Sequence, residues 1–347
     1  MVDVGVVGAG AGAAALSYVV DGAHPSADLT VLEKSGGVCG RAATRRRDDV
    51  TYDYGANYLR DDDARVNALV ADVLGTDGLA DVTEPVYTFD ADGDVSPGRD
   101  DDRRKWSYTG GLTQIAKRLF AATDATVHRH TRVETLERNG ETETWSVVDA
   151  DGERWGPFDA LVCNPPAPQT AALLRDAAWD AETRETLHAA AAAVPFDPIY
   201  TAVLHYPFET EAPYYALVNP EKDHAVGWIA REACKPGHVP DGESVLVVQA
   251  NADWSEAHFE DPPAENAAAL ADIAADVLDD DRLADPDWTD TQGWRYALPR
   301  DGVADAPVAA AREHDLHVVG DWVAGAPRLH AALRCGLDAG DRLAAQY

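Results

Sequence analysis

The sequence predicts an α/β fold in which a parallel sheet carries an inserted, mainly antiparallel α+β domain. Two observations predict the parallel sheet. An apolar run at 2–7 precedes Gly8-Ala9-Gly10 and an alanine-rich stretch at 11–20, which is the order strand, glycine turn, helix. A second apolar run, at 29–32, ends in Glu33. Alternating apolar and polar residues from about residue 199 predict the antiparallel part.

The glycine turn and Glu33 have the spacing of a dinucleotide-binding unit. Gly8 permits a tight turn, and Gly10 lets the backbone approach a pyrophosphate. The following helix N-terminus carries about half a positive charge and faces that phosphate, while Glu33 accepts both ribose hydroxyls. Ala13 replaces the third glycine of the usual G-x-G-x-x-G pattern and is small enough for close helix–strand contact. The carboxylate argues against NADP, whose 2′-phosphate it would repel. The alternative interpretation is an ordinary glycine-rich turn.

A second glycine-rich loop decides which dinucleotide is expected. Residues 34–46 read KSGGVCGRAATRR and follow Glu33 directly. An NAD-binding domain has no reason for such a loop, whereas a flavoprotein uses one to close over the pyrophosphate and ribityl chain of an extended FAD. Arg41 would donate charge-assisted hydrogen bonds to phosphate. A surface loop with a basic tail is the alternative.

Six segments of the chain then resemble, in order, the FAD-dependent oxidoreductases of the renalase-like branch of the flavin amine-oxidase superfamily. They are EKS with GRAATRR (33–46), YDYGANY (52–58), WSYTGGL (106–112), DALVCNPPAPQ (159–169), WRYALP (294–299) and GDW (320–322). The resemblance covers nearly the whole chain. It implies a two-dinucleotide-binding FAD Rossmann domain, of the kind found in glutathione reductase and amine oxidases, with an inserted antiparallel α+β substrate domain.

The resemblance also implies non-covalent FAD and a set of residues that contact it. In this family pattern the backbone of Val133 meets adenine, Asp321 hydrogen-bonds the ribityl chain, and the helix from about Leu329 aims its amides at the flavin C2 carbonyl. The implied FAD-binding residues are Gly8, Ala9, Gly10, Ala11, Gly12, Glu33, Lys34, Gly40, Arg41, Ala56, Asn57, Val133, Asn164, Trp294, Gly320, Asp321, Leu329, Ala331 and Ala332.

We expect the chain to cross between the two domains several times. The FAD-binding domain comprises residues 1–85, 106–168 and 291–347, a substrate-side hairpin spans 86–105, and the substrate domain spans 169–290. Periodicity predicts helices at 61–73, 111–121, 170–175, 181–193 and 264–279. It predicts strands at 131–137, 145–149, 160–163, 199–206, 214–219, 225–231, 244–250 and 316–319.

Composition limits the partners and the compartment. The 347 residues carry a net charge of −32, which argues against nucleic acid and anionic membranes as partners. We interpret the acidity as a surface adapted to a salt-rich cytoplasm, where ions screen self-repulsion. We expect no signal peptide and no membrane span, because no apolar run approaches about 20 residues. Four widely spaced cysteines predict neither a zinc site nor disulfides.

Three side chains are candidates for the substrate side of the pocket. Trp294 offers an indole wall against which a planar substrate ring could stack. Asn57 lies in the YDYGANY segment (52–58), which the resemblance implies is beside the flavin, and Tyr200 lies on a strand of the substrate domain. Each has a plain alternative, namely core packing for Trp294 and Tyr200 and a loop hydrogen bond for Asn57. The sequence shows no metal cluster and no evident general base, and hydride transfer from an electron-rich donor needs none.

These observations predict an FAD-dependent oxidoreductase that takes a hydride from a small, ring-containing donor and passes electrons to O₂ or another acceptor. The resemblance implies that the donor is a dihydronicotinamide isomer, that is, a reduced nicotinamide nucleotide. Its oxidation would return it to NAD(P), and reduction of O₂ would release hydrogen peroxide. A flavin amine oxidase is the enzymatic alternative, although neither Lys222 nor Lys235 can be placed beside the flavin from sequence. A non-catalytic carrier on the same fold is the alternative of another class. A monomer and a homodimer both remain open.

Overall fold

The parallel sheet lies at one end of the molecule. The structure is a computed structural model and describes residues 2–98, 103–179 and 181–347. Every neighbouring pair of its five strands is parallel. In spatial order the strands are β10 (Thr126–His128), β2 (Asp28–Leu32), β1 (Asp3–Val7), β14 (Ala160–Cys163) and β20 (Leu316–Val318). Strand β14 is fully buried, as its continuous apolar sequence predicts.

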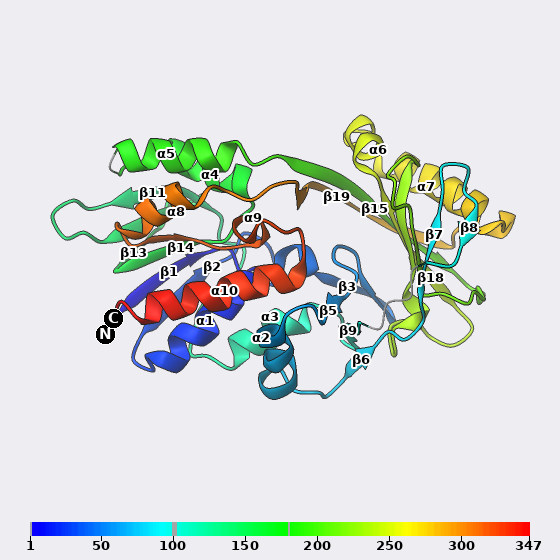
Figure 1. Cartoon of the computed structure of the whole chain (residues 1–347), viewed down its shortest axis with the longest axis horizontal. Coiled ribbons are helices and arrows are strands. Elements are labelled where there is room, and N and C mark those ends of the chain that lie inside the picture. Colours follow the sequence, from blue (N-terminus) through cyan, green and yellow to red (C-terminus); the bar gives the residue numbers. More distant parts are fainter. Residues whose placement is uncertain (1, 99–102, 180) are drawn as a thin grey trace.

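Two layers cover this sheet (Figure 1). One face packs on α1 (Ala11–Ala23), α3 (Gln114–Ala121) and α10 (Leu329–Ala344), whose apolar residues share one core with β1 and β2. The other face is covered by an antiparallel sheet and by helices that share a second core. The elements of this second layer are β11 (Val133–Arg138), β12 (Trp145–Asp149), β13 (Arg154–Phe158), α4 (Ala167–Arg175), α5 (Ala181–Ala192) and α8 (Asp305–Arg312).

Small sheets connect the two ends of the molecule. One pairs β3 (Thr44–Arg47) with β4 (Val50–Asp53), and the other orders β5 (Leu59–Arg60), β9 (Lys105–Tyr108) and β6 (Leu79–Asp81). Short helices lie beside them: η1 (Gly40–Ala42), α2 (Ala64–Ala68) and the π-helical turn η2 (Leu69–Val73). The short helix α9 (Asp321–Ala324) follows β20 and contributes Trp322 to the second core of the parallel-sheet end.

Two predicted helices begin later than expected. The helix predicted over 61–73 begins at Ala64, because the Asp63 side chain caps it by accepting the amides of Arg65 and Val66. The helix predicted from residue 111 begins at Gln114, because Gly111 has a φ of +78°, which a helix does not allow. The bounds of the remaining predicted helices differ by a few residues at most.

A seven-stranded sheet forms the other end. Its strands in spatial order are β19 (Trp288–Pro299), β15 (Phe196–Tyr206), β18 (Ser244–Ala250), β17 (Val226–Arg231), β16 (Ala216–Val218), β7 (Val86–Phe89) and β8 (Val95–Ser96). Strands β7 and β8 form the hairpin predicted over residues 86–105. Residues 99–102 of that range lie outside the described residues. One face of this sheet packs on α6 (Ala252–Ala257) and α7 (Pro263–Leu278). Two short helical turns complete this end: η4 (Asp281–Ala284) follows α7, and η3 (Glu232–Cys234) follows β17.

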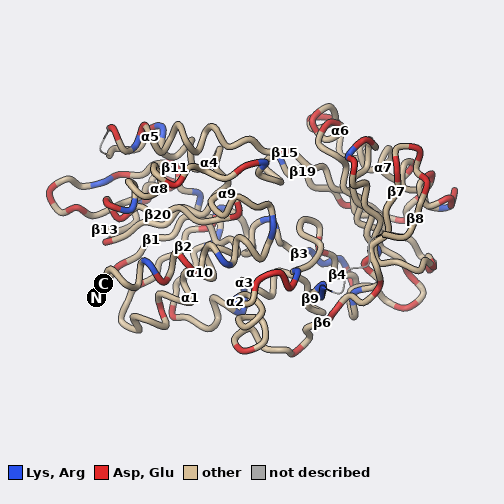
Figure 2. Tube along the Cα trace, viewed as in Figure 1, with Lys and Arg blue, Asp and Glu red and all other residues tan. Residues whose placement is uncertain are grey.

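The long strands β15 and β19 join the two ends (Figure 1). The parallel sheet, its helices and the antiparallel sheet confirm the predicted α/β class. Within the part of the chain that the structure describes, every helix is too short or too polar to cross a membrane. Acidic side chains occur along both ends of the molecule (Figure 2).

Candidate active site

A single large cavity of about 3380 Å³ extends from the carboxyl ends of β1 and β2 to the seven-stranded sheet. It is lined by residues from the glycine turn, the second glycine-rich loop, β19 and the start of α10. The residues predicted to bind FAD line it, except Ala9 and Ala331. The carboxyl ends of parallel strands are where α/β folds bind nucleotides, so the cavity lies where the sequence predicts a cofactor.

The glycine turn fixes the carboxylate that follows β2. Gly8 has a φ of +89° and donates its amide to Leu32 O. The amide of Ala9 donates to Glu33 Oε2 at 2.8 Å, and the amide and hydroxyl of Ser35 donate to Oε1 at 2.8 and 2.6 Å. Ala9 is therefore buried beneath the turn and holds Glu33, instead of facing the cavity as predicted.

Asn164 packs against the same turn from the end of β14. A Cβ atom at Gly10 would lie 2.3 Å from Asn164 Oδ1, and one at Gly12 would lie 3.1 Å from Ala332 O. The Asn164 side chain donates to Val319 O at 3.1 Å. Glycine at these positions therefore allows α1, β14 and α10 to approach closely around the turn.

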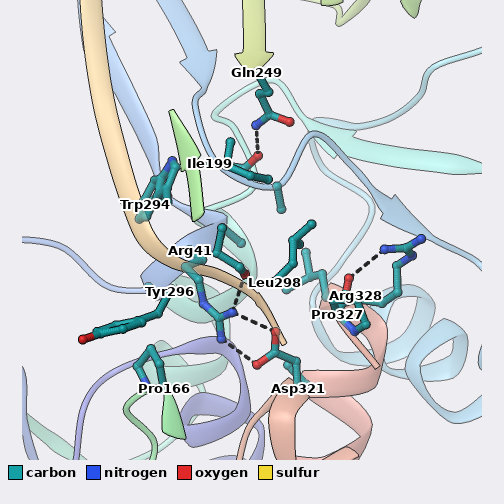
Figure 3. A pocket seen from close by; sticks show the side chains of 18 of the residues that line it. Arg41, Pro166, Ile199, Gln249, Trp294, Tyr296, Leu298, Asp321, Pro327 and Arg328 are labelled. Atoms are coloured by element: carbon teal, nitrogen blue, oxygen red, sulfur yellow. Dashed lines mark hydrogen bonds and ion pairs between the residues drawn. The ribbon is translucent and has the colours of Figure 1, made fainter. Parts of the chain in front are cut away.

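Arg41 and Asp321 point toward each other across the cavity (Figure 3). Arg41 Nη2 donates to Asp321 Oδ1 at 2.6 Å and Nη1 donates to Oδ2 at 2.9 Å. Nη1 also donates to Ala297 O at 2.7 Å. The pair joins the second glycine-rich loop to the turn after β20, two segments that were assigned separate roles from the sequence.

The N-terminus of α10 opens onto the cavity. The helix begins at Leu329, and Leu329, His330 and Ala332 line the wall, whereas Ala331 does not. The first amides of a helix have no partner within it, and the helix dipole makes this end electropositive. This end of α10 therefore offers hydrogen-bond donors for a negatively charged or carbonyl oxygen.

Trp294 lies in a three-layer stack. Its ring stacks on Tyr54 at 5.3 Å between centroids, and its Nε1 donates to Tyr54 O at 3.0 Å. The guanidinium of Arg45 lies over the Tyr54 ring at 4.2 Å and is bound by both oxygens of Asp290. Burial acts to lower the pKa of Arg45, but the hydrogen bond to Asp290, together with the charges of Asp290 and the nearby Tyr54 and Tyr52, outweighs it and the pKa is raised. The guanidinium therefore stays charged, and the indole is held in one orientation.

Asn57 is held by Gln249. Asn57 Nδ2 donates to Gln249 Oε1 at 3.1 Å, and Gln249 Nε2 donates to Gly55 O at 2.7 Å. All three residues line the cavity, with Gln249 projecting from β18. Asn57 is thus both a cavity residue and a loop hydrogen-bonding residue, the two roles weighed for it.

Tyr200 does not reach the cavity, which corrects its assignment as a pocket residue. It is 4% exposed and its ring packs against Trp254 and Phe259 beneath α6. Side chains alternate along a strand, and the neighbouring Ile199 takes the cavity face of β15, opposite Trp294 on β19.

The cavity differs in charge from the rest of the molecule. Among the described residues, thirteen Lys and Arg residues line it and only nine Asp and Glu residues do. The whole chain has 29 of the former and 61 of the latter. The lining is therefore richer in basic residues than the chain as a whole, which favours anionic over cationic ligands.

Comparison with known proteins agrees with this geometry. Residues 6–73 match the model of the NAD(P)-binding Rossmann-like domain, and residues 82–344 match that of flavin-containing amine oxidoreductases. The chain belongs to the flavin-containing amine oxidoreductase family. It is therefore an FAD-dependent oxidoreductase, and the amine-oxidase part of the resemblance seen in the sequence is confirmed.

Three solved structures show the same fold. Cyclohexylamine oxidase from Brevibacterium oxydans IH-35A superimposes with a TM-score of 0.76 at 15% identity, covering 99% of both chains. Wild-type putrescine oxidase bound to putrescine gives 0.74 at 12% identity, again over 99% of both chains. Reduced UDP-galactopyranose mutase gives 0.78 at 9% identity, over 100% of this chain and 94% of the other. At these identities the likeness concerns the fold alone.

The described residues fit the FAD that this family uses. Glu33 is placed for ribose hydroxyls, the turn at Gly10 and Gly12 leaves backbone exposed for a pyrophosphate, and the start of α10 offers amides at the far end. Cys335 is not part of the cavity wall, and burial raises the pKa of its thiol. Both observations favour non-covalent FAD.

Three cavity residues were missed in the sequence. Gln249 directly follows the apolar run Val245–Val248 in a strand that is buried throughout, and a polar residue at that position was the available signal. Tyr54 lies inside the YDYGANY segment, but its stacking on Trp294 joins positions 240 residues apart. Arg45 lies in the second glycine-rich loop, in which only Arg41 was given a role from the sequence, and the structure shows it bound to Asp290.

Proposed function

We propose that the chain oxidises a small, anionic, ring-containing hydride donor, and that a dihydronicotinamide isomer of the renalase type is the favoured donor. The observation that carries this proposal is a fixed indole wall, Trp294, in a cavity whose lining is more basic than the chain as a whole. A flat ring stacks on the indole, and the phosphate of a nucleotide is attracted by the basic lining.

The reaction balances with dioxygen as acceptor. The donor gives up a hydride and becomes the aromatic nicotinamide cation, and dioxygen with one proton takes up that hydride equivalent as hydrogen peroxide. FAD, when bound, supplies the ring that carries the two electrons between them. The protein residues orient the donor against Trp294 and hold Asn57 through Gln249. No general base is required, because the nitrogen of an electron-rich dihydropyridine already drives hydride loss.

The family match favours a second candidate, oxidation of an amine. Typical monoamine oxidases carry a lysine beside the flavin. Here Lys235 is fully buried and does not line the cavity. Lys222 lines the cavity but is 70% exposed, with its ammonium 3.9 Å from Asp197. A basic cavity lining also disfavours a protonated amine. For these reasons we rank amine oxidation second.

Anaerobic reduction of the purified flavoprotein tests the proposal. We expect dihydronicotinamide mononucleotides reduced at positions other than C4 to bleach the flavin rapidly. The matched dihydronicotinamide ribosides, which lack the phosphate, should bleach the flavin more slowly. The difference in bleaching rate between mononucleotide and riboside should shrink as the KCl concentration is raised. Simple amines and putrescine serve as the comparison series. Bleaching by amines but by no dihydronicotinamide would replace the proposal with the second candidate.

The contribution of the indole wall is measured with Trp294→Leu. Stacking on an aromatic ring contributes about 0.5–1.5 kcal/mol, so the KM for a ring-containing donor should rise by roughly 2- to 12-fold. Trp155→Leu, at a partly buried position in β13 outside the cavity, is the control.

A further inference from the structure

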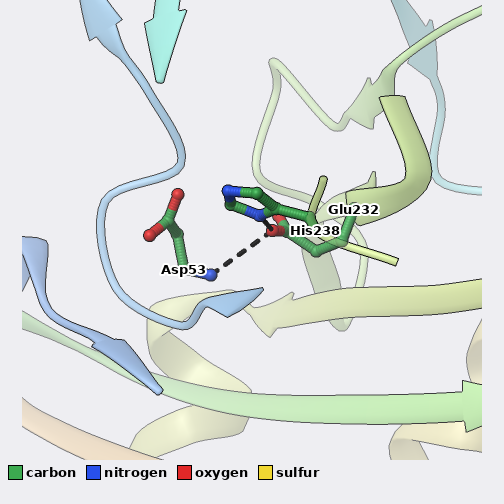
Figure 4. Close-up of side chains that lie close together, drawn as sticks. All are labelled: Asp53, Glu232 and His238. Atoms are coloured by element: carbon green, nitrogen blue, oxygen red, sulfur yellow. Dashed lines mark hydrogen bonds and ion pairs between the residues drawn. The ribbon is translucent and has the colours of Figure 1, made fainter. Parts of the chain in front are cut away.

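Four ionisable side chains form a cluster beside the cavity, outside the residues used above. Asp53, at the end of β4, meets Glu232, Lys235 and His238 from the segment after β17, and all four side chains have no exposed surface. Figure 4 shows Asp53, Glu232 and His238 facing one another. We call Asp53, Glu232, Lys235 and His238 the buried quartet. Its members come from segments about 180 residues apart.

The Asp53 carboxylate is completely hydrogen-bonded. Oδ1 accepts from Thr44 Oγ1 at 2.6 Å and from the Leu112 amide at 2.9 Å. Oδ2 accepts from Lys235 Nζ at 2.9 Å and from Ser107 Oγ at 3.1 Å. The end of β4 is therefore bound from three directions: by β3, by the segment from β9 to α3, and by the segment after β17.

The charges of the buried quartet balance. Lys235 Nζ lies 2.8 Å from Glu232 Oε1, and His238 Nδ1 lies 2.7 Å from Glu232 Oε2. His238 Nε2 lies 2.9 Å from Tyr108 O, which only accepts. With a carboxylate at one ring nitrogen and a carbonyl at the other, His238 satisfies both as an imidazolium. Two anions then face two cations.

Lys235 occupies the centre of what would otherwise be a group of metal ligands. The ligand atoms of Asp53, Glu232 and His238 lie within 4.8 Å of one another, and the ammonium contacts two of these side chains. Burial acts to raise the pKa of Asp53, but Lys235 and His238, together with the hydrogen bonds from Thr44 and Leu112, outweigh it and the pKa is lowered. Burial acts to lower the pKa of Lys235, and the carboxylates of Asp53 and Glu232 reverse this. Asp53 and Lys235 therefore remain ionised.

The residues directly after Asp53 form the flavin-facing segment. Tyr54 O accepts from Trp294, Gly55 O accepts from Gln249, and the Ala56 amide donates to Arg41 O. A Cβ at Gly55 would lie 2.1 Å from Arg41 O, so this segment packs closely against the backbone of the second glycine-rich loop. Any displacement of Asp53 must therefore move residues 54–57 relative to both Trp294 and the second glycine-rich loop.

We propose that the charge-balanced buried quartet positions residues 54–57 against the flavin and the indole wall, and that Lys235 acts as a positioning residue through Asp53. Lys235 does not touch the donor. Removing one charge leaves its buried partner unpaired, and the end of β4 must shift to bring water or a counter-ion to that partner. Removing an opposite pair of charges restores the balance.

A double-mutant cycle on Lys235→Met and Asp53→Asn tests this. For Lys235→Met we expect at least a tenfold rise in the FAD dissociation constant of the apoprotein, a shifted visible flavin spectrum, and at least a tenfold slower flavin reduction at saturating donor. The Asp53→Asn/Lys235→Met variant should recover each of these to within about threefold of the wild type. If Lys235→Met does not fold, recovery of folding and FAD binding in the double variant is the deciding result.

Tyr206→Phe is the matched control for a loss of buried hydrogen bonding. The Tyr206 hydroxyl donates to Leu283 O at 2.7 Å beneath η4 and away from the cavity. This variant should lower thermal stability and leave the flavin spectrum and reduction rate unchanged. The proposal is overturned if Lys235→Met changes thermal stability only, as the control does, or if the double variant is as impaired as the single one.

Discussion

Arg41 and Asp321, 280 residues apart in the chain, form a two-bond ion pair at 2.6 and 2.9 Å on the wall of the cavity. Asp321 is 6% exposed and the Arg41 side chain is 29% exposed, so the pair is partly shielded from water. The pair ties the loop after β2 to the turn after β20, the two segments that we expect to contact an extended FAD. Because Asp321 is buried, removing one partner leaves the other without its counter-ion in the wall of the cavity.

Asp321→Asn should weaken FAD binding. The amide retains the shape but leaves the Arg41 guanidinium without its carboxylate, and hydrogen bonds to charged groups contribute about 1.5–3 kcal/mol. We expect the FAD dissociation constant of the apoprotein to rise by roughly 10- to 100-fold, measured by quenching of flavin fluorescence. Asp261→Asn, at an exposed position beside His258 and outside the cavity, is the control and should leave the constant unchanged.

Glu33→Gln should act on the adenosine half of the cofactor. The glutamine loses the charge that attracts ribose hydroxyls, and one of its two terminal groups cannot accept the amides of Ala9 or Ser35. The FAD dissociation constant should rise by about tenfold or more, while the visible spectrum of the bound flavin stays unchanged because the isoalloxazine is distant. Glu185→Gln, at an exposed position outside the cavity, is the control. An unaltered constant would show that Glu33 does not hold the ribose.

The nucleotide half of the site could be predicted from the sequence because its signals are local. Gly8, Gly10 and Glu33 lie within one strand–turn–helix–strand unit, and the structure brings them together as the spacing predicts. The substrate half depends on pairings between distant segments. Trp294 meets Tyr54, and Gln249 meets Asn57, only because β19 and β18 lie in one sheet beside the β3–β4 pair.

Tyr200 shows the limit of a strand pattern most clearly. Alternation predicts that Tyr200 and Ile199 face opposite sides, but it does not say which side faces the cavity. The helices α6 and α7 cover the face that Tyr200 shares with Tyr206, and this leaves Ile199 to the cavity. The buried quartet was missed for a similar reason, since no local spacing joins Asp53 to Lys235.

His317 should make the protein sensitive to mild acid. Burial, with help from Arg312 and Arg342, lowers the pKa of His317 from 6.5 to about 4. Between these values the unfolded chain binds a proton that the folded chain does not, so the free energy of unfolding falls as the pH falls. The loss attributable to this side chain reaches about 3 kcal/mol near pH 4 and does not grow below it.

Urea unfolding of the wild type and His317→Phe across pH 4–7.5 measures this loss. The variant should lose less stability than the wild type between pH 6.5 and 4, and the two should change in parallel outside that window. Curves that run parallel across the whole range would remove His317 as the cause.

The net charge of −32 should make folding depend on salt. The screening length falls from about 30 Å at 0.01 M to about 3 Å at 1 M ionic strength, so self-repulsion among surface acids is largely removed in molar salt. We expect the melting temperature to rise steadily from low to molar KCl. An uncharged osmolyte at the same osmolality is the control. A melting temperature independent of KCl would show that the acidic surface is no adaptation to salt.

The central claim is that the two glycine-bearing loops and Asp321 together hold one extended FAD. The most direct measurement is an equilibrium titration of the apoprotein, in molar KCl, with FAD, FMN and NAD⁺ in competition. The account predicts one tightly bound FAD per chain, much weaker binding of FMN because it lacks the adenosine that Glu33 holds, and no displacement of FAD by NAD⁺. Binding of NAD⁺ in preference to FAD, or no binding of FAD at all, would contradict it.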